Sequence, residues 1–266
     1  MPSYKYKILN DKQWLYDQYV VNKLSTNQIA SFINCKASNT IRQALIRHGI
    51  DVRNVSDGLT IHNEPIILNA SVIDGCLLGD GWLKRWNKSS DVSLPYFTKK
   101  NKYKDHVVYV ADMIMPTDVT YKCIKPIINK CNDKEFIYYQ LKTPVSDLLM
   151  VFYDRWYSTG SRQPPDDIII DNVSMLHWFL DDGSSYLRKR NSDTKQVTIT
   201  LSCEGFTAER IQMLADKIKL ITRLPFKKTK CNSGCGFRLT LTQKYTQQFY
   251  EYIGKCPVES FNYKWK

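Results

Sequence analysis

The sequence predicts an α+β protein in which two pseudo-symmetric αββαββα repeats with antiparallel sheets follow a small all-α segment. Three observations lead to this prediction. Residues 1–55 show helical periodicity and almost no β-rich runs. From about residue 66 onward, helical stretches alternate with stretches rich in β-branched and aromatic residues. This second part contains the same order of elements twice, and the acids Asp80 and Asp182 lie one repeat length of 102 residues apart.

Residues 1–55 are expected to form a helix-turn-helix domain. A helix over about 14–21 comes first, and two short helices with apolar faces follow between residues 24 and 50. Residues 35–37 leave room only for a tight turn between them. Ser38 suits the N-cap of the second short helix and Gly49 its C-terminal end. Residues 56–65 carry Gly, Pro and small polar residues without an apolar period, which predicts a linker.

The two short helices resemble the helix-turn-helix of DNA resolvases and invertases. On this resemblance the residues that face the DNA are Lys36, Ser38, Asn39, Arg42 and Arg47. The alternative is a small helical bundle that packs on the rest of the protein and leaves its basic residues in solvent.

The charge of the chain indicates the kind of partner. With 38 Lys and Arg against 26 Asp and Glu, the 266 residues carry a formal charge of +12. Such a surplus favours a polyanion, nucleic acid first and an anionic membrane second. No run approaches the roughly 20 apolar residues of a membrane span, and the N-terminal residues lack the apolar core of a signal peptide. We therefore expect an intracellular protein located with nucleic acid, in the cytoplasm, a nucleoid or an organelle matrix.

The first repeat, residues 66–165, and the second, residues 166–266, are expected to begin with equivalent helices. The first contains a helix to about residue 80, strands WLKRW and VSLPYF, a helix near 104–115, strands VTYKCIKPII and FIYYQL, and a helix over 147–157. The second contains a helix over 173–182, strands SSYLRKR and VTITLS, a helix near 207–222, a hairpin of FKKTK and GFRLTLT, and a helix over 245–253.

Asp80 and Asp182 are expected at the C-terminal ends of the first helix of each repeat. A carboxylate is unfavourable there, because the exposed carbonyl groups already carry negative potential. A hard divalent cation would stabilise it, since such ions take oxygen ligands from carboxylates and backbone carbonyls. Gly75 and Gly79, four residues apart, give one helix a flat surface that lets another backbone come close. Two acids meeting on a pseudo-twofold axis suggest metal-assisted hydrolysis of a phosphodiester, with one acid for each strand of a duplex.

The two acidic stretches also carry a family resemblance. IDGCLLGDG, residues 73–81, and MLHWFLDDG, residues 175–183, resemble the paired motifs of the LAGLIDADG homing endonucleases, in the single-chain branch with two motifs. Residues 99–107, 163–168 and 201–214 are similar to further stretches of that family. The likeness spans about residues 66–266, and the N-terminal segment lies outside it.

The resemblance implies a set of site residues and a cofactor. They are the metal-binding carboxylates Asp80 and Asp182, the carbonyl ligands Gly79 and Asp181, and basic residues near the scissile phosphate, Arg162 in the first half and Lys228 or Lys230 in the second. The cofactor is Mg²⁺, with Mn²⁺ or Ca²⁺ as substitutes in binding. Arginine stands at 162 where lysine is usual, and it does not easily relay a proton.

Other acids and histidines have simpler interpretations. A single LLGDG or DDG stretch could be an ordinary helix end with a turn. The side chains of Asp74 and Asp181 are expected to face solvent or to lie at helix ends. His106 and His177 are expected to pack in the interior, since the four histidines are too dispersed for a metal cluster.

The strands that follow each acid alternate polar and apolar residues, as expected for sheets that bind DNA in the major groove. The candidate reading residues are Lys84, Trp86, Lys88, Gln140, Lys142, Arg188, Arg190, Arg238, Thr240 and Thr242. The alternative is that these side chains contact only phosphate.

The resemblance implies a site-specific double-strand DNA endonuclease that cuts across the minor groove and leaves 3′ overhangs. We expect a monomer with internal pseudo-twofold symmetry, encoded in an intron or free-standing. Two alternatives stay open: an intron RNA maturase of the same fold, and a non-catalytic regulator that binds DNA through the helix-turn-helix.

Overall fold

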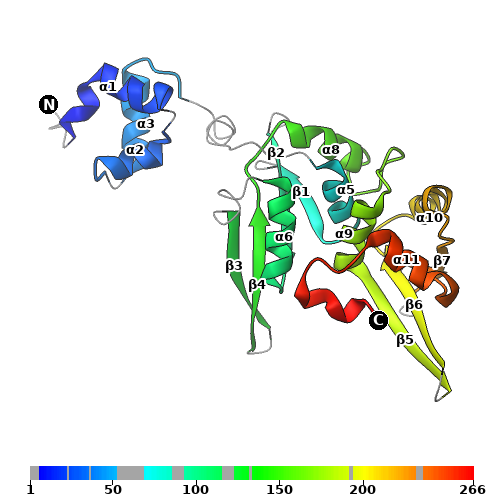
Figure 1. Cartoon of the computed structure of the whole chain (residues 1–266). Coiled ribbons are helices and arrows are strands. Elements are labelled where there is room, and N and C mark those ends of the chain that lie inside the picture. The colour runs from blue at the N-terminus through cyan, green and yellow to red at the C-terminus, as the bar shows by residue number, and fades with distance from the viewer. Residues whose placement is uncertain are drawn as a thin grey trace. The chain divides into compact units, whose positions relative to one another are not determined.

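The computed structural model describes residues 6–22, 24–35, 37–52, 69–85, 93–115, 123–131, 134–191, 194–231 and 236–266. The chain divides into two compact units, Met1–Asn63 and Glu64–Lys266 (Figure 1). The predicted linker, residues 56–65, lies outside the described residues. Within the described part of the chain, no helix has the length and apolar character needed to span a membrane.

The first unit is helical, as predicted. Its elements are η1 (Lys7–Asn10), α1 (Lys12–Tyr16), η2 (Asp17–Val21), α2 (Thr26–Phe32) and α3 (Ser38–Arg47). Leu15, Ile29 and Ile41 are fully buried in its own core. A reciprocal capping box between Ser25 and Gln28 starts α2 by satisfying two backbone N–H groups at the helix end.

The turn between α2 and α3 differs in detail from the sequence prediction. Asn34 adopts a left-handed conformation (φ 55°), which its short polar side chain tolerates. Ser38 is the first residue of α3 and Ala37 is the N-cap, without a side-chain hydrogen bond, so the predicted serine cap was wrong. Gly49 has a φ of 65° directly after the helix, as expected for a C-terminal glycine.

The second unit contains the order αββαββα twice. The first repeat comprises α5 (Ala70–Leu78), β1 (Gly81–Arg85), β2 (Pro95–Asn101), α6 (Lys104–Ile114), β3 (Ile124–Cys131), β4 (Lys134–Lys142) and α8 (Leu148–Tyr157). The second comprises α9 (Asn172–Asp182), β5 (Gly183–Asn191), β6 (Thr194–Ser202), α10 (Ala208–Thr222), β7 (Lys227–Lys230), β8 (Phe237–Leu241), η3 (Gln243–Tyr245) and α11 (Thr246–Ile253), with η4 (Glu259–Lys264) near the C-terminus.

Each repeat forms one four-stranded antiparallel sheet, in the orders β1-β2-β4-β3 and β5-β6-β8-β7. The strand pairing repeats as well: Gly81 lies opposite Lys99 in the first sheet, and Gly183 lies opposite Leu201 in the second. Gly183 lies 102 residues after Gly81, and Leu201 lies 102 residues after Lys99. Positions 102 residues apart are therefore structurally equivalent and can be compared directly. The predicted fold class is confirmed.

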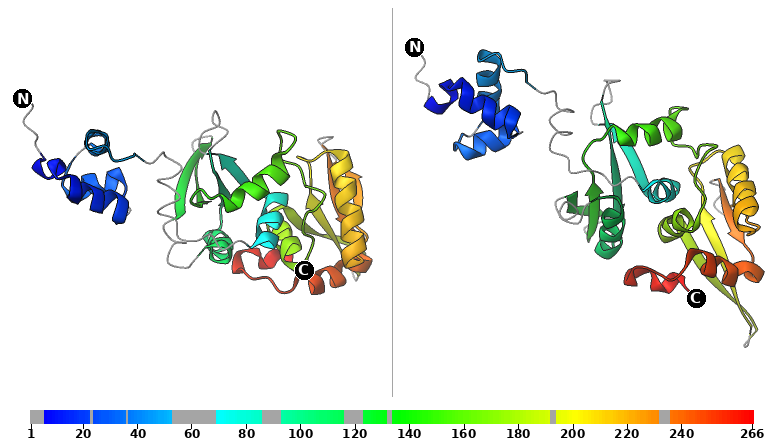
Figure 2. Two further views of the ribbon diagram at one scale, coloured as in Figure 1. Left: turned by 90° about the horizontal axis from the view of Figure 1, so that it is seen from above. Right: turned by 45° about the horizontal axis from the view of Figure 1, so that its top comes forward.

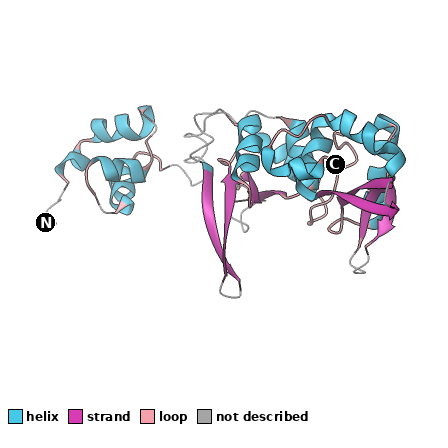
Figure 3. Cartoon of the chain, turned by 60° about the horizontal axis from the view of Figure 1, so that its bottom comes forward, coloured by secondary structure: helices cyan, strands magenta, loops and turns pink. Residues whose placement is uncertain are grey.

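The first helices of the two repeats, α5 and α9, lie side by side between the two sheets (Figure 2). Figure 3 shows the helices on one side of the second unit and the strands on the other. The contact depends on Gly75, because a Cβ atom there would lie 2.5 Å from the carbonyl oxygen of Ser174 and 2.9 Å from Cβ of His177. Close approach of the helices therefore requires glycine at this position.

Asp74, expected to face solvent, is fully buried instead. It accepts hydrogen bonds from the Trp156 indole (2.8 Å) and the Ile169 backbone N–H (3.0 Å), and it pairs with Arg155 (3.3 Å). The acid thus ties α5 to α8 and to the segment that leads into α9. The prediction failed because the partners lie more than 80 residues away in sequence and give no local signal.

Candidate active site

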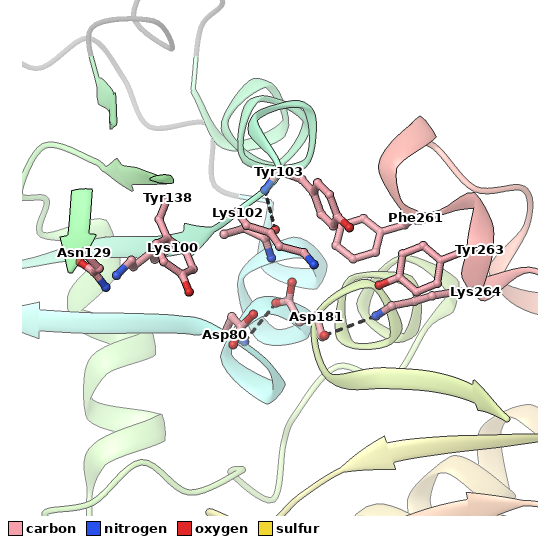
Figure 4. Close-up of a pocket in the computed structure, with 11 residues that line it drawn as sticks. Asp80, Lys100, Lys102, Tyr103, Asn129, Tyr138, Asp181, Phe261, Tyr263 and Lys264 are labelled. Atoms are coloured by element: carbon pink, nitrogen blue, oxygen red, sulfur yellow. Dashed lines mark hydrogen bonds between the residues drawn. The ribbon is translucent and has the colours of Figure 1, made fainter. Parts of the chain in front are cut away.

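The C-terminal ends of α5 and α9 meet, and each presents one of the two predicted acids. Asp80 is exposed in the turn after α5, and Asp182 is the half-buried last residue of α9. A Cβ atom on Gly79 would lie 2.4 Å from Cβ of Asp181, so the two chain segments touch here. The backbone N–H of Asp80 donates a hydrogen bond of 3.1 Å to Oδ2 of Asp181 (Figure 4).

Negative charge is concentrated at this meeting point. The pKa of Asp182 is raised to about 7, first by burial and then by the negative charges of Asp80 and Asp181. Such a cluster is costly for the protein alone and favours binding of a cation.

Asp181 has its own counter-ion. Lys99 Nζ donates to both carboxylate oxygens of Asp181, and both side chains are 0% exposed. Burial is the largest single effect and lowers the pKa of Lys99, but the charge and hydrogen bond of Asp181, together with the smaller effects of Cys76 and Asp80, raise that pKa above its ordinary value. The side chain of Asp181 was expected to face solvent or to lie at a helix end. It lies near the end of α9, as the second alternative predicts, but it is buried and does not face solvent.

Two basic residues bind the carbonyl groups at the ends of the acid-bearing helices. Arg162 Nη1 donates to the carbonyl oxygens of Gly79 (2.9 Å) and Gly81 (2.6 Å). Lys264 Nζ donates to those of Phe179 (2.9 Å) and Leu180 (2.6 Å), and to that of Asp181 at 3.4 Å. Positive charge is favourable at these helix ends. The two carbonyl groups predicted as metal ligands, those of Gly79 and Asp181, thus accept hydrogen bonds from the protein's own cations.

Lys264 is a site residue that the sequence reasoning missed. It lies 102 residues after Arg162, the same interval that separates Asp80 from Asp182, and this spacing was the signal that could have found it. Burial lowers the pKa of Lys264 to about 8, because its effect is larger than the opposing effect of the nearby acids. The predicted candidates lie elsewhere: Lys228, on β7, donates to the carbonyl oxygen of Ala208 (3.2 Å), and Lys230 is exposed at the end of that strand.

A pocket of about 400 Å³ opens beside Asp80 and is lined by basic and aromatic side chains (Figure 4). Its lining residues are Asp80, Lys100, Asn101, Lys102, Tyr103, Asn129, Tyr138, Asp181, Phe261, Tyr263 and Lys264. Lys100 Nζ lies 4.2 Å from the ring centre of Tyr138. The stretch KKNKYK contributes two of the lysines of this pocket, Lys100 and Lys102, although the sequence predicted it only as a point of resemblance.

The oxygen donors at the two acids fit a hard divalent cation whose other ligands come from a phosphate and water. Among the described residues, no group of three or more His, Cys, Asp or Glu side chains is arranged to hold a metal ion. Asp181 is neutralised by Lys99, which leaves Asp80 and Asp182 as the available carboxylates. Mg²⁺ is commonly held by one or two carboxylates together with substrate phosphate oxygens and water.

The predicted reading residues that the structure describes lie on the sheet faces away from the helices. Leu83, Leu141 and Leu239 are buried on the helix side of their strands, so their neighbours point to the opposite face. These neighbours are Lys84, Gln140, Lys142, Arg238 and Thr240, with Thr242 just beyond the end of β8. Trp86 and Lys88 lie outside the described residues, as do the side chains of Arg188 and Arg190.

In the N-terminal unit, Asn39 and Arg42 are exposed on α3 and Ser38 is half-buried. Arg47 Nη2 donates to the Leu9 carbonyl oxygen (3.0 Å) and to Oδ1 of Asn10 (3.2 Å). This side chain, predicted to contact DNA, therefore forms hydrogen bonds within its own unit. Lys36 lies outside the described residues.

Comparisons with known proteins identify similar chains and a shared fold. The chain is 30% identical over 222 residues to the uncharacterized protein MJ1098 of Methanocaldococcus jannaschii, covering 81% of each chain. It is 20% identical over 201 residues to a Wickerhamomyces canadensis protein named "Probable intron-encoded endonuclease 1", covering 71% of this chain and 80% of the other. The solved structure of the homing endonuclease I-WcaI, bound to its DNA recognition sequence, shares the fold with a TM-score of 0.61 and 17% identity, over 81% of this chain and 95% of that one.

A family model supplies the assignment. The model of the LAGLIDADG DNA endonuclease family matches residues 70–249, which include both acid-bearing helices and all the described strands of both sheets. The protein therefore belongs to the LAGLIDADG DNA endonuclease family.

Proposed function

We propose that the protein is a site-specific double-strand DNA endonuclease that hydrolyses one phosphodiester bond in each strand with divalent cations, Mg²⁺ foremost. The observation that supports this proposal is the meeting of Asp80 and Asp182 at the ends of two helices that contact each other, between two polar sheet faces. We further propose that one chain acts as a monomer, located with its target DNA inside the cell, and that the products carry 3′ overhangs.

The residues of the site have distinct roles in this proposal. Asp80 and Asp182 hold the cations. Bound Mg²⁺ would supply charge neutralisation at the phosphate and lower the pKa of a nearby water. Arg162 stays protonated and stabilises negative charge without moving a proton. Lys264, with a pKa near 8, can both stabilise charge and exchange a proton near neutral pH.

The sheets supply recognition in this proposal. Side chains such as Lys84, Gln140 and Lys142 lie on one exposed sheet face and can reach the major groove, where every base pair is distinguishable. Asn39 and Arg42 of α3 would extend the contact along the duplex, as in the resolvases and invertases that the segment resembles. Affinity should fall steeply with salt because each neutralised phosphate releases counterions.

A plasmid library of candidate sites, incubated with and without Mg²⁺, tests the proposal. We expect one cleaved sequence with Mg²⁺ and none without it, and run-off sequencing of the ends should show 3′ overhangs. Asp80→Asn and Asp182→Asn should each slow double-strand cleavage by at least about 100-fold, because each removes a cation ligand worth several kcal/mol in the transition state.

Binding measured on the same variants separates the alternatives. Both Asn variants should retain DNA affinity within about 3-fold of wild type, which is under 1 kcal/mol. Specific DNA binding without cleavage by the wild type would favour a regulator. Preference for a structured intron RNA over every DNA would favour a maturase.

A further inference from the structure

The ion pair joins Lys99 of the first repeat to Asp181 of the second, and the equivalent positions, Leu201 and Gly79, cannot form such a pair. The position equivalent to Lys99 in the second sheet is Leu201, as the matching strand pairs show. The position equivalent to Asp181 on the first helix is Gly79. The second repeat therefore places a core leucine where the first places a buried lysine, and both positions face the interior.

The pair acts on the backbone of one acid. The helix α9 continues through Asp182, so that acid is held within the helix. The helix α5 ends at Leu78, and Asp80 lies beyond it in the turn. The backbone N–H of Asp80 is instead bound by Oδ2 of Asp181, at 3.1 Å.

The surroundings leave Asp181 little freedom. Its carboxylate is held by Lys99, and Nε2 of His106 lies 3.5 Å from Oδ1. Its Cβ fills the space that a side chain on Gly79 would need. Burying two charges is expensive, and the cost is offset only when geometry and hydrogen bonds are good. A hydrogen bond to a fixed carboxylate is also stronger than one to a neutral acceptor.

We propose that Asp181, neutralised by Lys99, is a positioning residue for Asp80 alone, so that the two acids are held by different means and the two DNA strands are cut at unequal rates. This inference rests on the proposed endonuclease function for its second part. Its first part, the fixing of the Asp80 backbone, concerns the free protein.

Two double variants test the proposal while avoiding an unpaired buried charge. Lys99→Met/Asp181→Asn keeps an oxygen acceptor for the Asp80 N–H, whereas Lys99→Met/Asp181→Ala removes it. Leu201→Met, at the equivalent position of the second repeat, is the matched control for a change in core packing. Thermal unfolding of all three variants reports whether they are folded.

The first measurement is amide hydrogen exchange of Asp80 in the free full-length protein. Loss of a hydrogen bond to a charged group should speed exchange of this amide by at least about 10-fold in the Ala variant. In the Asn variant and in Leu201→Met, the exchange rate of the Asp80 amide should stay within about 3-fold of wild type. A 3-fold change corresponds to less than half the free energy of a 10-fold change. Wild-type exchange that is unprotected, or equal in the Asn and Ala variants, would overturn the positioning role.

The second measurement is cleavage of a plasmid in which each strand of the target carries its own label. We expect the wild type to cut the two strands at different rates, and the Ala variant to change the ratio of those rates by at least about 10-fold. A general loss of stability would slow both strands equally. An unchanged ratio in the Ala variant would contradict the strand effect.

The two measurements separate failure of this inference from failure of the proposed function. Protected Asp80 exchange in a wild type that cuts no DNA would support the positioning role and refute the nuclease. Cleavage by wild type with unprotected Asp80 exchange would support the nuclease and refute the positioning role.

Discussion

At the residue scale, Asp80 and Asp182 hold equivalent places in the two repeats but differ in exposure. Asp80 is exposed in a turn, whereas Asp182 is half-buried within its helix. Burial and the adjacent acids raise the pKa of Asp182 to about 7. The metal-free protein is therefore destabilised by its own site, as is common where function requires clustered charge.

This electrostatic cost of ionising Asp182 predicts how the stability of the fold depends on pH. The pKa of Asp182 is higher in the folded protein than the value near 4 of an unfolded aspartate. The fold thus favours the protonated form, and stability falls as pH rises from about 4 to about 7. Asp182→Asn removes this cost, so we expect its melting temperature at pH 8, without metal, to exceed that of wild type by about 2–5 °C.

Thermal unfolding across pH checks this expectation. The difference should vanish below pH 4, where Asp182 is protonated in both states. Asp112→Asn, on the exposed surface of α6, is the control and should shift the melting temperature little. A wild type as stable as Asp182→Asn at pH 8 would contradict the raised pKa.

A second residue-scale prediction concerns the basic residue of the second repeat. Lys264 contacts the end of α9, whereas Lys228 binds the start of α10. We expect Lys264→Met to slow cleavage by about 100-fold, the loss of one charge-assisted contact in the transition state. Lys228→Met should slow it by less than about 3-fold, an effect under 1 kcal/mol.

Single-turnover cleavage rates, corrected for the folded fraction, decide between the two lysines. The opposite order of effects would restore Lys228 as the basic residue. Lys264→Arg should recover charge at the helix end and be closer to wild type than Lys264→Met.

At the element scale, the ends of β2 and β6 differ in charge although they are equivalent in position. Lys100 and Lys102 follow the ion-paired Lys99, and the residues 102 positions later are Ser202 and Glu204. The basic pair lines the pocket beside Asp80. At these two positions the first repeat therefore offers a phosphate backbone two lysines, where the second repeat has a serine and a glutamate.

This asymmetry predicts a change in salt dependence. Lys100→Ser/Lys102→Gln should reduce the slope of log affinity against log salt concentration by about 1 to 2, since each phosphate contact contributes about 0.9. DNA binding measured between 50 and 200 mM salt gives the slope.

Lys219→Ser/Lys244→Gln is the control of equal charge change. Both control lysines are exposed, on α10 and η3, outside the pocket beside Asp80. Equal slopes for the two double variants would show that the lysines of β2 and its following turn do not contact phosphate.

At the scale of the whole molecule, the chain joins a small helical unit with its own core to a larger unit that carries the site. The smaller unit contains two helices with a tight corner and exposes polar and basic residues on the second of them. The described residues of its core all belong to the unit itself, so core packing does not account for the exposed Asn39 and Arg42 on α3.

We predict that Asn39→Ala/Arg42→Ala shortens the protected DNA footprint and weakens binding by about 10- to 100-fold, while the cleavage position stays the same. A specific base contact contributes about 1–3 kcal/mol. Footprinting and binding assays on the full chain measure both effects. Asn22→Ala/Lys12→Ala, on exposed positions outside α3, is the matched control, and a footprint unchanged by either pair would assign the unit to another role.

The sequence predicted the elements well because their causes are local. Hydrophobic periodicity, caps such as Thr207 and Asp171, and glycines at helix ends act over three or four residues. Duplication then related the two halves without any knowledge of contacts. The misplaced cap at Ser38 is a shift of one residue, since both Ala37 and Ser38 lie in the same turn.

The site was predicted less completely than the fold. Asp80, Asp182 and Arg162 could be named from motif and spacing, and the structure brings all three to the helix ends. Lys264 follows the same spacing and could have been found. Lys99 could not, because a lysine in an alternating strand is normally assigned to solvent.

The sequence by itself determined the two repeats, their order of helices and strands, and the acids that end the first helix of each. Only the tertiary structure decided which charges are buried, that Asp181 pairs with Lys99, and that Arg162 and Lys264 bind the ends of the acid-bearing helices. The physical reason is the difference in sequence separation between the interactions that determine the two kinds of feature. Secondary structure follows from neighbours along the chain, whereas a buried charge is stabilised by partners that are about 80 residues away in the sequence and adjacent only after folding.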